Sequence, residues 1–305
     1  MTAAETTEYQ RHKTIIAILL TCVAYGYFNI GDATIKVLVQ RGFHFSQIVF
    51  SNCVVIIACV AAVGWWKDGK KAFVMRKKGL VVLRAVLSCL VGIINILALP
   101  HVKLTTFYTL VFTSPLWVAI LAVIFAGEKF QLNRILATVA GFGAVAYAFR
   151  PGAGLFNAWA ALLLVGAFLY SAGLVVLRMV GPKESRTMII LTGSVVSIIM
   201  VLPFLPFHFQ PMTWYDFGLF FMMGFLGAIS VSCISYAFQN APAASAVAPF
   251  HYTQIIWGTL LGYYLFHEVP DDRVILGAGC IIAAGLYLIF SESRRAPVVR
   301  LRGQT

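Results

Sequence analysis

The stretch TSPLWVAILAVIFAGEKFQLNRILATVAGFGAVAY, residues 113–147, returns 140 residues later as TQIIWGTLLGYYLFHEVPDDRVILGAGCIIAAGLY, residues 253–287. In both copies a long apolar segment ends in a glutamate, a short polar link follows, and an arginine precedes the next apolar segment. Eight positions are identical: Thr113 with Thr253, Trp117 with Trp257, Leu121 with Leu261, Glu128 with Glu268, Ile135 with Ile275, Leu136 with Leu276, Ala144 with Ala284 and Tyr147 with Tyr287. Chance matching of apolar helices explains Leu, Ile and Ala pairs but not the uncommon Trp and Glu pairs, so we interpret the pattern as an internal duplication.

The composition excludes a soluble globular protein. Of 305 residues, 60% are hydrophobic and 11% are charged, whereas soluble domains have about 45–50% and about 25%. So few charged residues cannot cover the surface of a globule of this size. At about 20 residues per crossing, the chain has room for roughly ten membrane helices and almost none for a domain in water.

Hydropathy predicts an all-α integral membrane protein with ten helices. The predicted ranges are 14–39, 46–66, 79–99, 104–126, 133–149, 157–180, 187–206, 214–238, 244–266 and 273–291. With the N-terminus inside, seventeen Lys and Arg lie in inner segments and four in outer loops, at Arg41, Lys103, Arg150 and Arg273. Cytoplasmic loops collect basic residues, so this asymmetry predicts an even number of spans with both termini in the cytoplasm.

The repeat unit contains five predicted helices, an odd number, so the second copy is expected to be inverted in the membrane relative to the first. We expect a first five-helix repeat over residues 1–152, a second over 153–292 and a basic cytoplasmic tail over 293–305. Inverted repeats are the architecture of many secondary transporters, whose substrate site lies between the repeats near the middle of the bilayer.

Several segments together are similar to a known family. They are residues 236–245 (YAFQNAPAAS), 266–268 (FHE) and 273–287 in the second half, and 113–117 (TSPLW), 127–128 (GE), 141–143 (GFG) and 150–152 (RPG) in the first. In this pattern the chain resembles the EamA-type proteins of the drug/metabolite transporter superfamily. The resemblance covers nearly the whole chain and implies ten helices in two inverted halves, cytoplasmic termini and carriage of a small metabolite.

The first predicted helix carries a polar stripe. Tyr25, Asn29, Asp32 and Lys36 are spaced by 4, 3 and 4 residues, so they share one face of an otherwise apolar helix. Ionisable groups within a membrane helix mark a substrate pathway by default. We therefore expect Asn29, Asp32 and Lys36 to line a cavity, with Asp32 also able to take up a coupling proton. The alternative is an Asp–Lys pair that neutralises itself while Lys36 extends to the outer surface.

Further polar candidates lie on the second and third helices. Arg84, Ser88 and Asn95 share a face of the third helix. Arg84 is near the cytoplasmic end, so it is either a cavity residue or an anchor that reaches the membrane surface. Asn95, and Asn52 on the second helix, either bind a ligand or hydrogen-bond between helices.

The ninth helix carries His251 and Gln254 on one face. A buried histidine is either a ligand-binding group or one satisfied by a neighbour. Aromatic side chains are expected to form a cavity wall or to pack in the core; these are Tyr108, Trp117, Tyr170, Tyr236, Tyr252 and Trp257. Pro115 and Pro249 fall inside predicted helices, where the missing N–H donor bends or interrupts the helix.

Other functions lack a matching pattern. The net charge of +12 follows from topology, so no nucleic-acid partner is expected, and no cofactor or metal site is expected from cysteines that lie in apolar stretches. A membrane enzyme or a channel is the alternative, but no paired intramembrane carboxylates and no filter motif are visible. We expect a secondary transporter of the bacterial inner (plasma) membrane that works by alternating access. Its partners are lipid, a small metabolite, favoured to be amino-acid-like or carboxylate-bearing, and either a coupling proton or a counter-substrate.

Overall fold

A computed structural model describes residues 3–98, 101, 104–149, 158–266 and 272–294, whose regular structure is helical throughout. The longer helices are α1 (Ala3–Gln40), α2 (Phe45–Asp68), α3 (Lys78–Ala98), α4 (Leu104–Val111), α5 (Ser114–Phe125), α6 (Leu132–Phe149), α7 (Ala158–Val180), α8 (Arg186–Val201), α10 (Trp214–Asn240), α12 (Thr253–Phe266) and α13 (Asp272–Arg294). Short helical turns are η1 (Gly69–Phe73), η4 (Leu202–Phe204), α9 (Leu205–His208), α11 (Ala244–Val247) and η5 (Ala248–Tyr252).

Six helical segments in the described residues are long and apolar enough to cross a membrane. They are His12–Gln40, Phe45–Phe73, Lys78–Asn95, Ala158–Val180, Arg186–His208 and Trp214–Asn240, and shorter apolar helices cover Thr109–Phe125, Leu132–Tyr147 and Ile275–Tyr287. Within the described residues, each range expected from hydropathy falls on helix. The fourth and the ninth are interrupted within their length, and the seventh ends in the short turns η4 and α9. The molecule is therefore a helical, multi-pass integral membrane protein.

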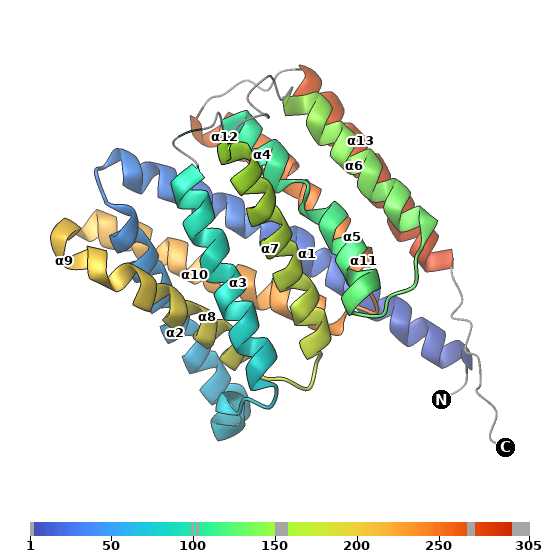
Figure 1. Cartoon of the computed structure of the whole chain (residues 1–305), viewed down its shortest axis with the longest axis horizontal. Coiled ribbons are helices and arrows are strands. Elements are labelled where there is room, and N and C mark those ends of the chain that lie inside the picture. The colour runs from blue at the N-terminus through green and yellow to red at the C-terminus, as the bar shows by residue number, and fades with distance from the viewer. Residues whose placement is uncertain (1–2, 99–100, 102–103, 150–157, 267–271, 295–305) are drawn as a thin grey trace.

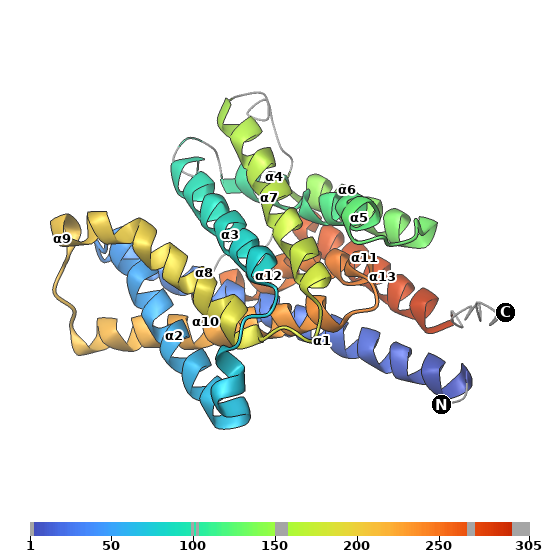
Figure 2. The ribbon, with the colours of Figure 1, turned by 60° about the horizontal axis from the view of Figure 1, so that its bottom comes forward.

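The helices pack in pairs that join the two halves of the chain. α1 lies along α10 and α12, α7 lies along α3 and α5, and α2 packs on α8. α6 and α13 lie side by side at one edge of the molecule in both views (Figure 1, Figure 2). The first five predicted ranges correspond in order to the second five, so α1 corresponds to α7 and α3 to α10. Under this correspondence the α1–α10 pair becomes the α7–α3 pair, while the α2–α8 and α6–α13 pairs each become themselves. This is the pairing that two related, interlocked halves produce.

The start of α1 and the end of α13 lie at the same end of the molecule in both views (Figure 1, Figure 2). The largest buried cluster lies where α1, α5, α7 and α10 meet, and it includes Tyr25, Val118, Leu174 and Phe238. Since these four helices come from both halves, the core itself holds the halves together.

Close approach of α2 and α10 depends on a glycine. A Cβ atom at Gly224 of α10 would lie 2.5 Å from Cβ of Val55 on α2. We expect Gly224→Ala to lower the free energy of unfolding by about 1–3 kcal/mol through overpacking. Gly218 of the same helix has no such neighbour within 4 Å, so Gly218→Ala is the matched control and gains up to about 1 kcal/mol of helix propensity. Unfolding in a denaturing detergent measures both, and equal stability of the two variants would contradict the packing described here.

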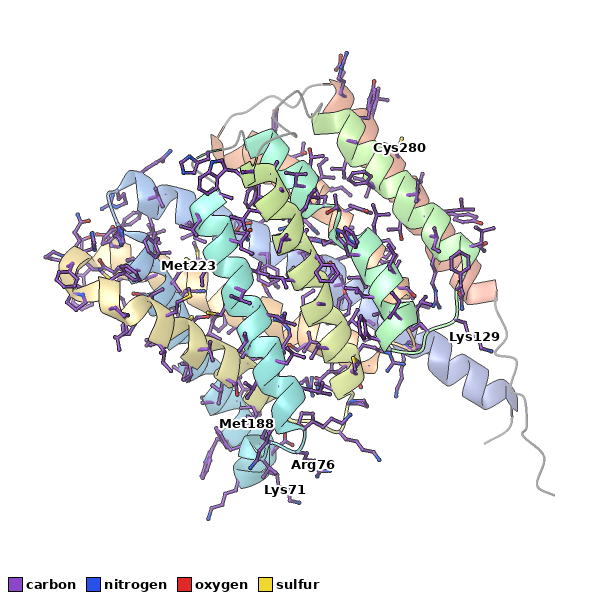
Figure 3. The ribbon with its side chains drawn as sticks, viewed as in Figure 1. Lys71, Arg76, Lys129, Met188, Met223 and Cys280 are labelled. Atoms are coloured by element: carbon purple, nitrogen blue, oxygen red, sulfur yellow. The ribbon has the colours of Figure 1, made fainter. Side chains whose placement is uncertain are left out.

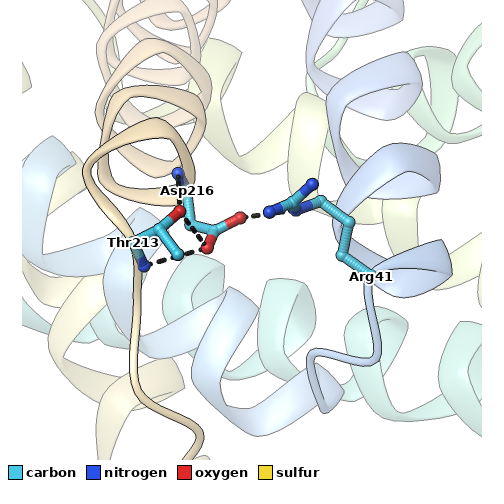
Figure 4. Close-up of polar contacts among 3 residues, drawn as sticks. All are labelled: Arg41, Thr213 and Asp216. Atoms are coloured by element: carbon cyan, nitrogen blue, oxygen red, sulfur yellow. Dashed lines mark hydrogen bonds and ion pairs between the residues drawn. The ribbon is translucent and has the colours of Figure 1, made fainter.

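One end of the bundle is joined by polar contacts between the α1–α2 link and the start of α10. Arg41 Nε donates to Asp216 Oδ1 at 2.5 Å, and Thr213 donates through its backbone N–H and its hydroxyl to Asp216 Oδ2 (Figure 4). Thr213 and Asp216 form a capping box that starts α10. Gln47 and Gln210 exchange two further hydrogen bonds at this end, so links from the two halves hold each other in place.

His44 and His208 stack at the same end, with ring centroids 3.9 Å apart. His44 Nδ1 also accepts from the backbone N–H of Ser46 at the start of α2. Partial burial, and then the neighbouring His208, lower the pKa of His44 below its usual 6.5. Because the folded state disfavours the protonated ring, the contribution of this contact is present above pH about 6.5 and declines as the pH falls below it.

We expect His208→Ala to raise the pKa of His44 toward its usual value, because the second imidazole no longer opposes the charge. NMR titration of ring-labelled histidine, with wild type and variant in the same detergent, measures this directly. An unchanged His44 titration would show that His208 does not act on it.

The opposite end of α10 is joined to the first half by Glu128, which follows α5. The Glu128 carboxylate accepts from the backbone N–H of Ala244, from the backbone N–H of Ser245 at 3.3 Å and from the Ser245 hydroxyl at 2.5 Å. Arg134 Nη1 donates to the same hydroxyl at 3.2 Å. A carboxylate of the first half thus caps the first turn of α11 in the second half.

Candidate functional site

The broken helices meet near the middle of the bundle. The fourth range is interrupted between α4 and α5, with Pro115 in the first turn of α5. The ninth range is interrupted by the 3-10 turn η5, which contains Pro249. Thr113 donates to the carbonyl of Leu110 at 2.6 Å, and its repeat partner Thr253 donates to the carbonyl of Phe250 at 2.7 Å. The two threonines satisfy matching carbonyls, which irregular backbone at membrane depth requires.

His251 lies in η5, and it joins the two breaks. Its side chain is 4% exposed. Nδ1 lies 2.9 Å from the hydroxyl of Ser114, the first residue of α5, and Nε2 lies 3.0 Å from Oε1 of Gln254. Since an amide oxygen only accepts, this arrangement fits a neutral imidazole that donates from Nε2 and accepts at Nδ1. Ser171 of α7 donates to the carbonyl of Ser114 at 2.9 Å, which brings a third segment to the same point.

Aromatic rings surround this histidine. Tyr25 of α1 stacks on the imidazole with centroids 4.4 Å apart and planes at 15°. Phe112, in the α4–α5 break, presents its ring edge at 5.4 Å, and Tyr170 of α7 lies at 5.6 Å. The hydroxyls of Tyr25 and Tyr170 are 3.2 Å apart. Side chains from α1, α4–α5, α7 and η5 thus converge on one point.

Arg84 extends from α3 to α7, where it lies beside Gly173, three residues after Tyr170 of the cluster. Its guanidinium packs on α7, with Nη1 3.3 Å from the place where a Cβ of Gly173 would lie. Its Nε is buried and has no hydrogen-bond partner in the described part of the chain. Arg84 forms no ion pair with a described side chain. Its role as a cavity residue stays a prediction.

The polar stripe of α1 continues from Tyr25. Asn29 is half-buried and donates to the carbonyl of Tyr25 at 2.9 Å, while its Oδ1 faces Gly258 of α12. Asp32, one turn further on, is exposed and has no partner among the described residues. The side chains of Lys36 and Tyr108 lie outside the described residues, so the proposed pairing of Lys36 with Asp32 stays a hypothesis.

The two tryptophans that were predicted to be cavity or core residues both pack between helices. Trp257 Nε1 donates to the carbonyl of Cys22 at 3.0 Å, and the indole lies 3.1 Å from the Cβ position of Gly26 on α1. Trp117 packs edge-on against Phe168 at 5.6 Å, and its Nε1 is buried without a partner in the described chain.

The remaining predicted residues lie away from His251. Tyr252 points toward α6, where its hydroxyl donates to the carbonyl of Thr138 at 3.2 Å and its ring covers Gly141. Tyr236 lies under the guanidinium of Arg186 at 4.8 Å, close to the end of α10. Asn52 faces Gly227 of α10, and its buried Oδ1 has no partner in the described chain. Asn95 lies beside Gly166 of α7.

Three residues of the cluster were not singled out from sequence: Phe112, Ser114 and Ser171. Ser114 had a usable signal, because the shift of 140 places it opposite Gln254 directly after the paired threonines. Within the described residues, no group of three or more metal-binding side chains occurs.

Taken together, the fold and its centre define a multi-pass helical membrane protein in which two broken helices, one from each half, meet at a buried polar and aromatic cluster. The profile of the EamA-like transporter family matches residues 12–150 and again residues 157–291. The chain belongs to this family, as the resemblance in its sequence indicated.

Individual relatives are transporters by name. The chain is 27% identical over 190 residues to an S-adenosylmethionine uptake transporter of Rickettsia bellii (strain RML369-C), a match covering 62% of this chain and 65% of the relative. It is 30% identical over 193 residues to a riboflavin transporter of Rhizobium johnstonii, covering 61% of this chain and 62% of the relative. The matched stretch is thus less than two thirds of either relative.

A solved crystal structure supports the fold. It superposes with a TM-score of 0.72 at 13% identity, covering 93% of this chain and 98% of the other. The family and the relatives' names indicate a transporter rather than an enzyme.

Proposed function

We propose that this protein is a secondary transporter that carries a small organic metabolite across the bacterial inner membrane by alternating access. Its two halves, residues 1–152 and 153–292, would form ten spans with both termini and the tail, 293–305, in the cytoplasm. Family membership and the small metabolites in the relatives' names support carriage of a small molecule. The bacterial relatives favour a bacterial membrane.

The observation that carries the proposal is the hydrogen bond between Ser114 and His251 at 2.9 Å. It connects the break in the fourth helix to the break in the ninth, so any movement of one half against the other changes the surroundings of both. Paired helix breaks at corresponding positions of two halves mark the substrate site of many secondary transporters. We therefore place the substrate beside Tyr25, Arg84 and His251.

Arg84 favours a substrate with a carboxylate or another anionic group. A guanidinium at this depth without a counter-anion is costly, and a ligand carboxylate would supply two acceptors in the geometry that the planar donor fork prefers. Asn29 and Asp32, on the same helix as Tyr25, extend the polar surface and would contact the amino or hydroxyl groups of an amino-acid-like substrate. Asp32, exposed and unpartnered among the described residues, is the group proposed to carry a coupling proton; exchange against a counter-substrate is the alternative.

A ligand panel tests this proposal. Purified protein is heated with amino acids, other carboxylates and organic cations, because a ligand that binds only the folded state at about 100 times its Kd stabilises by about 2.7 kcal/mol. We expect carboxylate-bearing compounds to raise the melting temperature and to be recovered chemically unchanged. Stabilisation by cations alone would contradict the anion site, and chemical conversion of the bound compound would contradict the transporter.

A further inference from the structure

A strongly basic surface is formed by the link between α2 and α3, the adjoining helix ends and Lys183 of the α7–α8 link. We define the basic platform as the side chains of Lys67, Lys70, Lys71, Arg76, Lys77, Lys78 and Lys183, all of them exposed. None of them forms an ion pair with a side chain in the described residues. Figure 3 shows Lys71 and Arg76 at one end of the bundle. The acids beside the platform are Asp68, which is exposed in the link, and the buried Glu184, so the platform keeps a net positive charge.

The link that carries this charge is held in one shape by the second half of the chain. The carboxylate of Glu184, itself 4% exposed, accepts from the backbone N–H groups of Arg76 at 2.9 Å and Lys77 at 2.6 Å. The hydroxyl of Ser185 donates to the carbonyl of Ala72. Gly69 supplies the positive φ, 54°, that ends α2 and turns the chain into η1.

This fixed shape is more than membrane orientation requires. The rule that basic residues stay in the cytoplasm depends on their number near a helix end during insertion. Membrane orientation requires no folded link. It also does not explain why the buried carboxylate of Glu184 accepts hydrogen bonds from backbone amides of the link. Lys77 Nζ donates to the carbonyl of Met179 at 2.8 Å. The contacts of Glu184 and Ser185 hold the backbone of the link, while the other cationic side chains stay exposed above it, as a binding surface needs.

Apolar side chains place the platform at the depth of lipid headgroups. Trp65 and Trp66, at the end of the apolar helix α2, are 60% and 83% exposed. Phe73 packs its ring against Trp65 at 6.2 Å, and Val74 is 51% exposed. Tryptophan at the end of a membrane helix lies at the level of the headgroups. Basic side chains at that level lie next to lipid phosphates, whereas a soluble partner would have to approach from the water.

We propose that the basic platform is a binding site for anionic phospholipid headgroups. Lys67, Lys70, Lys71 and Arg76 would contact the phosphates, while Trp65, Trp66 and Phe73 rest against the upper acyl chains. Clusters of four or more basic residues next to a membrane helix bind anionic lipids through such contacts. The proposal is independent of which solute is carried.

Native mass spectrometry of the full chain with equal amounts of phosphatidylglycerol and phosphatidylcholine tests the platform. One variant carries Lys67→Gln, Lys70→Gln, Lys71→Gln and Arg76→Gln, and the matched control, with Lys67→Arg, Lys70→Arg, Lys71→Arg and Arg76→Lys, keeps all four charges. We expect wild type to retain phosphatidylglycerol preferentially and the platform variant to lose this preference by at least about fivefold, with the control within about twofold of wild type.

Equal retention of the two lipids by wild type, an unchanged platform variant, or an equal loss in the control would overturn the proposal. Equal retention would instead favour an acidic protein partner. Should the fourfold variant not fold, the wild-type preference is followed as salt rises from about 0.1 M to about 1 M, where the screening length falls to about 3 Å. A headgroup site predicts a steep loss, and inorganic phosphate at millimolar concentration should leave the bound lipid in place. A preference that is indifferent to salt would contradict the electrostatic contact.

Discussion

Replacing Arg84 with alanine is expected to remove substrate binding and, with it, transport. The guanidinium packs on α7 beside Gly173, three residues after Tyr170, and its buried Nε has no partner in the described chain. Truncating one member of a buried, hydrogen-bonded charge pair costs about 2–5 kcal/mol, which corresponds to about 30-fold to several-thousand-fold in affinity. Isothermal titration with the compound that stabilises wild type most strongly measures the loss.

The conservative variant separates charge from geometry. Arg84→Lys keeps the positive charge but loses the planar donor fork, so we expect an affinity between those of wild type and Arg84→Ala. An affinity of Arg84→Lys equal to that of wild type would mean that the site recognises the positive charge alone. Wild-type affinity in Arg84→Ala, with an unchanged melting temperature of the free protein, would remove Arg84 from the site.

The second large effect is expected at Glu128. Its carboxylate receives the backbone N–H of Ala244, which is fully buried, and both the N–H and the hydroxyl of Ser245. Glu128→Ala leaves these donors without an acceptor, at a cost of about 3 kcal/mol. We expect local opening around the first turn of α11 to increase about 150-fold. Hydrogen exchange of the amides of Ala244 and Ser245, followed by mass spectrometry, measures it.

Two variants calibrate this result. Glu128→Gln keeps one acceptor oxygen and should raise exchange less than Glu128→Ala. Lys129→Ala changes the exposed neighbour of Glu128 (Figure 3) and should leave exchange unaltered. Protected amides in Glu128→Ala would mean that the two halves are not held together here.

Much of the helical pattern could be predicted, because apolar length and Pro placement are local properties. The repeat placed Thr113 opposite Thr253, and the structure gives both the same hydrogen bond to the carbonyl three residues earlier. Pro115 and Pro249 indicated where regular helix would be interrupted, and both lie in the first turn after a break or within it.

The direction of side chains at the breaks could not be predicted. Continuous α-helical periodicity does not hold in η5, where a 3-10 turn advances the side chains differently. His251 faces Tyr25 and Ser114, whereas the adjacent Tyr252 turns to α6. The direction of the Arg84 side chain could not be predicted either. Whether a long side chain extends to the surface or folds inward depends on the space on the facing helix. Gly173 on α7 provides that space.

The most direct test of a metabolite transporter with an anion site at Arg84 is uptake into proteoliposomes. Labelled amino acids, other carboxylates and organic cations are offered to vesicles containing wild type, Arg84→Ala or the packing control Gly218→Ala. The predicted result is saturable uptake of a carboxylate-bearing compound by wild type and Gly218→Ala, and none above protein-free vesicles for Arg84→Ala. Uptake confined to cations, or equal uptake of the carboxylate by Arg84→Ala, would contradict it.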